Sequence, residues 1–148
     1  MTEEKKVIVV SSIKKVHKLT PEQALAWNWV NEKEEEIKRL MLLTKGWNSY
    51  DADPPNTIAR DNLIKVLNEL GAQNFLEGRV TPSAEGGLAI VFNNENKYAD
   101  IECFNNGEIL AIVSDLPNRS IVWAVSEDPD STSKTSYATI KAIKEFLQ

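Results

Sequence analysis

The chain has 148 residues, of which 42% are hydrophobic, so it has the size of one ordinary domain with a continuous core. Its 17 basic and 22 acidic residues leave a formal net charge of -5, and the lysines and arginines form no large cluster. Because such a surface repels phosphate backbones, the composition argues against direct nucleic-acid binding and leaves a basic protein partner open. We expect a single domain over residues 1–148.

The apolar run at residues 7–10 is too short for a secretory signal or a membrane span. Because the run is β-branched, we expect residues 1–18 to form either an edge strand or a flexible arm, and an edge strand shared with a second copy favours a homodimer. Cys103 is the only cysteine, which excludes an internal disulfide and a cysteine-based zinc site. These features predict a soluble cytoplasmic protein of bacterial origin, with no membrane contact.

Two helices are expected in the N-terminal half. Residues 20–23, Thr-Pro-Glu-Gln, have the capping-box arrangement of a helix start. Apolar residues then recur at helical spacing to about residue 43, as one helix or two, with Gly46 as the stop. Thr57 is placed to cap a second helix, which we expect to end at Gly71.

From residue 79 onward the apolar period changes to two, and short turn-rich separators predict an antiparallel meander. Gly86 and Gly87 are expected at a turn or bulge before its first strand. Helical spacing returns after the hydroxyl-rich residues 131–135, which supply candidate caps for a C-terminal helix. The fold class is therefore α+β: N-terminal helices, a four-stranded antiparallel sheet, and a C-terminal helix packed on one sheet face. The predicted strands are residues 88–92, 98–104, 109–113 and 121–125.

Residues 46–55 read Gly-Trp-Asn-Ser-Tyr-Asp-Ala-Asp-Pro-Pro, and residues 80–87 read Val-Thr-Pro-Ser-Ala-Glu-Gly-Gly. Together they resemble a family of small bacterial and mobile-element proteins with the signature Gly-Trp-Asp-x-Tyr, a proline, and later Pro-Thr-Pro-x-Gly-Gly before a strand. The resemblance covers about residues 37–112 and implies a shared fold. This chain departs from the signature at Asn48, where aspartate is usual, and at Ser83, where proline is common.

Trp47 and Tyr50 give this loop large amphipathic surfaces, and its diproline stiffens the backbone. In one interpretation, Trp47 fills the space between the helices and the sheet, and Asp51 or Asp53 caps local amides. In the other, Trp47 anchors a loop that presents Tyr50, Asp51 and Asp53 to a partner. Two unpartnered aspartates offer too few oxygen ligands for calcium or magnesium, so we expect no metal.

Asp100 and Glu102 lie two residues apart on one predicted strand, so they share a sheet face with Tyr98 and Phe104. Such a pair of carboxyl groups can hold a raised-pKa acid beside an ionised base. Cys103 points to the opposite, apolar face, where we expect a small core residue rather than a reactive thiol.

No motif supplies a nucleophile, a phosphate-binding loop or a cofactor to accompany that pair, and the sole histidine, His17, lies among lysines. We therefore expect no cofactor. The leading hypothesis is a non-enzymatic protein-binding module, such as an antitoxin, an immunity protein or a phage-type inhibitor, that docks on a protein partner. The alternative is a small hydrolase or small-ligand-binding protein that uses the carboxylates of the sheet face. The expected binding residues are Trp47, Tyr50, Asp51, Asp53, Tyr98, Asp100 and Glu102.

Overall fold

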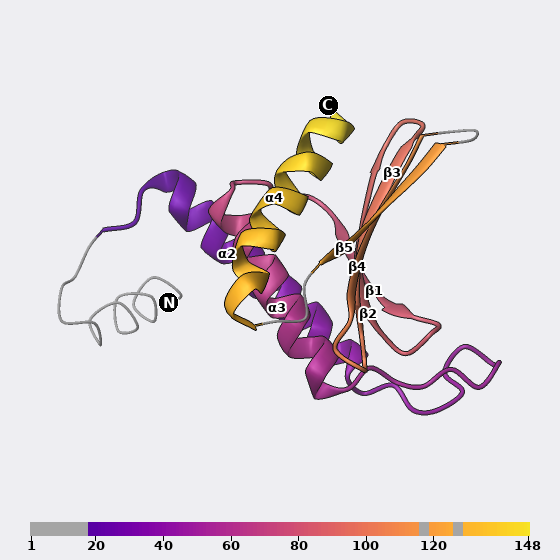
Figure 1. The fold of residues 1–148 in the computed structure, drawn as a ribbon. Coiled ribbons are helices and arrows are strands. Elements are labelled where there is room, and N and C mark those ends of the chain that lie inside the picture. The colour runs from indigo at the N-terminus through magenta and orange to yellow at the C-terminus, as the bar shows by residue number, and fades with distance from the viewer. Residues whose placement is uncertain (1–17, 116–118, 126–128) are drawn as a thin grey trace.

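The computed structural model describes residues 18–115, 119–125 and 129–148, with side chains described over residues 18–115 and 137–148. Within these ranges the helices lie on one side of an antiparallel sheet, which Figure 1 shows nearly edge-on. The predicted α+β class is confirmed, whereas the expectations for His17 and residues 7–10 lie outside the described residues. The elements are α2 (Pro21–Leu40), α3 (Thr57–Ala72), β1 (Arg79–Ser83), β2 (Gly87–Asn94), β3 (Lys97–Phe104), β4 (Ile109–Asp115), β5 (Arg119–Val125) and α4 (Pro129–Leu147).

Helix α2 is one continuous helix that begins with the predicted capping box. The Thr20 hydroxyl accepts a hydrogen bond from the Gln23 N–H at 3.0 Å, and the Gln23 side chain accepts one from the Thr20 N–H at 2.9 Å. The expected stop at Gly46 was wrong, because the helix ends at Leu40 with Met41 as its C-cap. The prediction extended the helix because Leu42 and Leu43 are apolar. In the structure Leu42 is 80% exposed, so it adds no buried contact that would favour a longer helix.

Helix α3 is capped by Asn56 rather than by Thr57, which is the first helical residue. The Asn56 side-chain oxygen accepts from the N–H of Ala59 at 3.0 Å, which satisfies one of the free amides of the first turn. Gly71 does not end the helix but lies inside its last turn. A Cβ there would come within 3.0 Å of a Val30 methyl group, so the glycine allows α2 and α3 to approach closely.

The strands pair in chain order, β1 to β5, and every pairing is antiparallel. The four predicted strands are present as β2 to β5, and the meander is confirmed. The sheet also contains β1, which was not predicted because its five residues include Pro82. Gly86 and Gly87 form the expected turn from β1 into β2, with φ angles of +93° and +149°.

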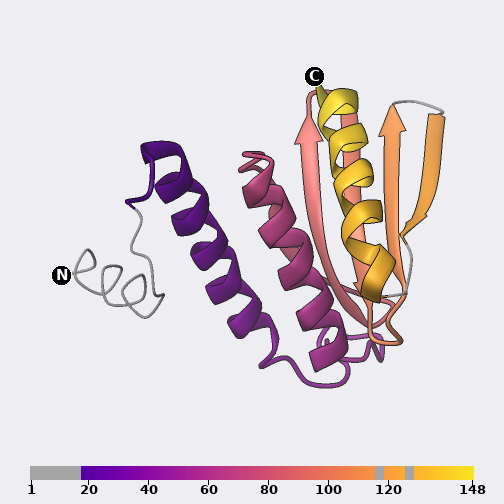
Figure 2. The same cartoon turned by 60° about the vertical axis from the view of Figure 1, so that its left-hand side comes forward.

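One sheet face forms the core under α3 and α4, which run side by side across it in Figure 2. Each large apolar side chain buried there stabilises the fold by roughly 1.5–3 kcal/mol. Helix α4 begins at Pro129, so residues 131–135 lie within the helix instead of capping it. No described helix covers the opposite face, which we call the open face. The core side chains of the covered face include Leu88, Ile90, Phe92, Ile101, Cys103, Ile140 and Ile143.

Candidate functional site

The α2–α3 loop, residues 41–56, runs past the end of the sheet and projects on the side away from the helices (Figure 1). It therefore adjoins the open face. The loop includes the sequence stretch at residues 46–55 from which binding was predicted, and its geometry decides how that stretch is presented.

Hydrogen bonds close the loop on itself. The indole N–H of Trp47 donates to the carbonyl oxygen of Asp53 at 3.1 Å, and the backbone N–H of Gly46 donates to the carbonyl oxygen of Ala52 at 2.8 Å. The side-chain oxygen of Asn48 accepts from the N–H groups two and four residues further on, at 3.0 and 3.2 Å. These bonds satisfy the backbone locally, so the loop holds its shape without belonging to a helix or strand.

The structure bears on the core-filling role considered for Trp47. Its side chain is half-buried and lies outside the described hydrophobic core, so it does not fill the space between helices and sheet. It fastens the loop through its indole N–H instead. Asn48, rather than Asp51 or Asp53, accepts the local amide protons.

Tyr50 stands at the tip of the closed loop with 84% of its surface exposed. Its neighbours Ser49 and Asp51 have φ angles of +70° and +96°. Residues other than glycine rarely adopt this backbone conformation, which costs on the order of 1–3 kcal/mol per residue. Lys45 lies 3.6 Å from the Asp51 carboxylate and 3.2 Å from that of Asp53, and the hydrogen bond to Asp53 contributes most to raising the pKa of Lys45. The loop thus presents an aromatic ring and two exposed carboxylates on a strained backbone.

Asn105, in the turn between β3 and β4, attaches the loop to the sheet. Its side-chain amide donates to the Pro54 carbonyl oxygen at 3.0 Å, and its side-chain oxygen accepts from the Asn56 N–H at 2.9 Å. The Asn56 side chain donates to the Asn105 carbonyl at 3.0 Å while its own oxygen caps α3 at Ala59. The N–H of Asn105 donates to the Gly86 carbonyl at 3.0 Å. One residue therefore joins the loop, the start of α3 and two turns of the sheet.

The predicted carboxyl pair lies on the open face, as expected. The Tyr98 hydroxyl donates to Asp100 Oδ2 at 2.5 Å, and the Ser83 hydroxyl donates to Glu102 Oε2 at 3.0 Å. Asp100 is only 6% exposed, and among the described residues its Oδ1 atom has no hydrogen-bond partner. Burial raises the pKa of Asp100 and that of Glu102, and the two hydroxyl donors offset part of this effect.

Tyr98 and Cys103 both belong to β3 but lie on opposite faces of the sheet, and burial raises the pKa of each. Burial and the hydrogen bond to Asp100 raise the pKa of Tyr98, so the phenol stays protonated and acts as a donor. Cys103 lies fully buried on the covered face, where burial raises the pKa of its thiol to about 12. The expected core role of Cys103 is confirmed.

The structure brings only part of the predicted set together. The Asn105 turn follows directly after Phe104, so the loop adjoins the end of β3 that carries Glu102. Tyr98 lies six residues before Phe104, about 20 Å further along the strand. Sequence reasoning missed Asn48, Asn56 and Asn105, because asparagine marks a turn without indicating its distant partner.

Comparison with models of protein families, with curated proteins and with solved structures finds no match for this chain. None of the described helices is long and apolar enough to cross a membrane. The described residues also contain no group of three or more histidine, cysteine, aspartate or glutamate side chains that would hold a metal ion.

The Asn105 attachment is tested by Asn105→Ala, which leaves the Pro54 carbonyl and the Asn56 N–H without their partners. We expect a loss of about 2–4 kcal/mol in the free energy of unfolding, measured by urea denaturation. Asn106→Ala is the matched control, because it removes one exposed turn bond and should cost about 1 kcal/mol or less. Equal losses for the two variants would contradict the assigned role.

The buried carboxyl group of Asp100 is tested by the pH dependence of stability. Its pKa is higher in the folded than in the unfolded chain, so its favourable contribution is present at low pH and is lost as pH rises through the folded-state pKa. The stability of Asp100→Asn relative to the original chain should therefore increase between about pH 4 and pH 7. Tyr98→Phe removes a bond that favours the charged form, so its relative stability should decrease over the same interval. A difference independent of pH for both variants would refute this description.

Proposed function

We propose that this chain is a non-enzymatic protein-binding module that docks on a protein partner through the α2–α3 loop and the adjoining end of the open face. The observation that carries the proposal is Tyr50, an almost fully exposed ring on a loop closed by Trp47 and attached by Asn105. A large aromatic side chain on a preformed loop loses little conformational entropy on binding, which is why tyrosine is frequent among interface anchors.

The charge around this ring supports a partner with a basic surface. Asp51 and Asp53 are exposed beside Tyr50 and together outweigh the charge of Lys45, which pairs with both. Glu102 lies on the nearby part of the sheet, with Glu85 close enough to affect its pKa. The whole chain carries a net charge of -5. Complementary charge speeds encounter and discriminates among partners, even where each exposed pair contributes little affinity.

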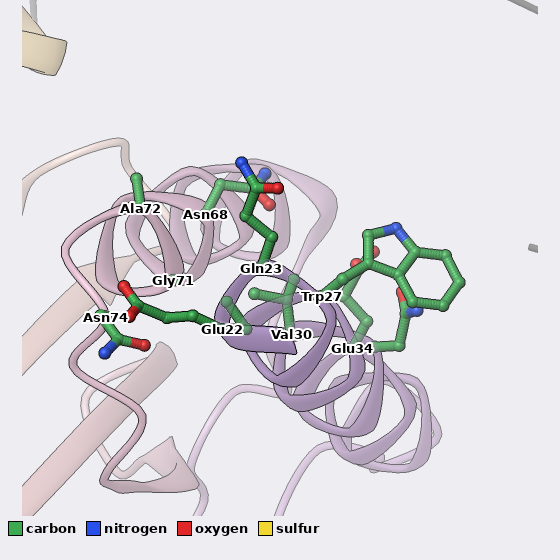
Figure 3. Close-up of a pocket in the computed structure, with 11 residues that line it drawn as sticks. Glu22, Gln23, Trp27, Val30, Glu34, Asn68, Gly71, Ala72 and Asn74 are labelled. Atoms are coloured by element: carbon green, nitrogen blue, oxygen red, sulfur yellow. The ribbon is translucent and has the colours of Figure 1, made fainter. Parts of the chain in front are cut away.

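The biological role that fits this surface is that of an antitoxin, an immunity protein or a phage-type inhibitor in the cytoplasm of a bacterium or encoded on a mobile element. Such a protein acts by covering its target and needs no chemistry of its own. Two grooves on the described surface, one lined by residues of α2 and α3 (Figure 3) and one by residues near the ends of α3 and α4, lie away from Asp100 and Glu102.

The test is a variant carrying Tyr50→Ala, Asp51→Asn and Asp53→Asn together. The original chain is used to isolate its partner from the source cell, and the affinity of the purified pair is then measured by calorimetry. We expect the triple variant to weaken binding by about 2 kcal/mol or more, the size of an interface hot spot. Tyr137→Ala is the matched control, because Tyr137 is an exposed tyrosine on α4 away from the loop. Unchanged affinity in a triple variant that melts normally would overturn the proposal.

A further inference from the structure

Two carboxyl groups lie next to each other on the open face, the side of the sheet away from the helices (Figure 1). In the strand register, Asp100 lies between Val91 of β2 and Ile112 of β4. Glu102, two residues further along β3, also has an apolar residue beside it on each neighbouring strand. These two residues are Ala89 and Leu110. Charged groups in apolar surroundings are normally paired with an opposite charge, so this carboxyl pair calls for a cation.

The described part of the chain supplies no such cation. None of the salt bridges found there includes Asp100 or Glu102. Burial raises the pKa of Glu102, and the nearby carboxylates of Asp100 and Glu85 raise it further. Arg79 lies in the same row of the sheet as Asp100, two strands away, but its side chain is exposed and belongs to none of those salt bridges. The negative charge at this place is therefore left uncompensated.

One oxygen atom of the pair is both buried and unpartnered. Asp100 is 6% exposed, and its Oδ2 atom accepts from the Tyr98 hydroxyl, whereas its Oδ1 atom has no hydrogen-bond partner among the described residues. The Ser83 hydroxyl holds Glu102 through Oε2 and does not use Oε1. Each carboxyl group is thus fixed by one hydroxyl donor and keeps one oxygen for a further donor.

A guanidinium group meets these requirements better than an ammonium group. It presents a planar set of N–H donors, so it can donate to oxygen atoms of two carboxyl groups at once. Residues two apart on a strand are separated by about 7 Å, a distance that one such group can bridge. The guanidinium group is also more weakly hydrated, so it loses less when it moves from water to the apolar surroundings of Asp100 and Glu102.

We propose that Asp100 and Glu102 bind one arginine side chain of the protein partner, whose guanidinium group donates to Asp100 Oδ1 and Glu102 Oε1. This inference rests on the proposed function, because it names the group of the partner that the open face receives. Glu102 lies near the α2–α3 loop, so one partner can contact both. Since Oδ1 is buried in the free chain, binding requires a movement of the side chains around Asp100, which the backbone amides of β3 will report.

The probe is N-acetyl-arginine amide, titrated into the ¹⁵N-labelled full chain while the amide chemical shifts of β3 are followed. We expect saturable shifts with a Kd on the order of 1 mM, the range of a small ligand with few contacts. The citrulline derivative has the same shape without the charge and should not bind. The lysine derivative should bind at least about threefold more weakly, because an ammonium group is more strongly hydrated.

The double variant Asp100→Asn with Glu102→Gln removes both charges but keeps acceptors for the two hydroxyl donors. It should reduce the affinity for the probe by at least about tenfold. Glu102→Gln alone, at a half-buried position, should reduce it at least about threefold and serves if the double variant does not fold. The matched control, Glu32→Gln with Asp61→Asn, makes the same charge change at exposed helix positions and should alter it less than about twofold.

The assignment is wrong if the arginine probe gives no saturable shifts, if the citrulline or lysine derivative binds as tightly, or if the control variant loses as much affinity as the double variant. Tighter binding of agmatine than of the probe would assign the pair to a small guanidine compound. A gain of about tenfold or more in Arg79→Gln would make Arg79 itself the occupant. The triple variant of the loop tests docking separately, because Asp100 and Glu102 are unchanged in it.

Discussion

The hydrogen bonds of Asn105 are the constraint on which the arrangement of this molecule depends. The residue stands in a sheet turn, yet its side chain binds the α2–α3 loop backbone at the Pro54 carbonyl and at the Asn56 N–H, on either side of Pro55. Through Asn56 it also reaches the cap of α3, the helix that contacts both the sheet and the other two helices. Its bonds therefore fix where the loop leaves the helical layer and where it meets the open face.

The open face contributes less to folding stability than the covered face, because it buries carboxyl groups where the covered face buries apolar side chains. Asp100 is buried there with one oxygen unpaired among the described residues, and an unpaired buried acceptor costs on the order of 1–3 kcal/mol. Tyr98 and Ser83 supply hydroxyl donors that offset part of the cost of burying the two carboxyl groups.

The alternation of apolar residues was sufficient to predict β2 to β5, because one sheet face is buried and the side-chain period of a strand is two. The capping box predicted the start of α2 for a similarly local reason. The end of α2 was misplaced because Leu42 fits the helical pattern but is exposed, and the cap of α3 was misplaced by one residue because both Asn56 and Thr57 have side chains that can cap a helix. The role of Asn105 depends on partners 49 and 51 residues away, which no local pattern contains.

Asn48 and Ser83 each have a defined role in the described structure. Asn48 acts through its side-chain oxygen, which accepts two amide protons, and an aspartate oxygen can accept the same bonds. Ser83 donates its hydroxyl to Glu102, which a proline at that position cannot do. Asn48 therefore helps to close the loop, whereas Ser83 adds a donor to the open face.

The central claim is that the α2–α3 loop is a preformed surface. It is tested most directly by ¹⁵N relaxation of the backbone amides of residues 46–56 in the free protein. We expect order parameters near 0.85 at Trp47, Tyr50, Ala52 and Asn56, the value typical of rigid backbone. Order parameters below about 0.6 across these amides would contradict the account, because a loop that moves freely on this timescale presents no fixed surface to a partner.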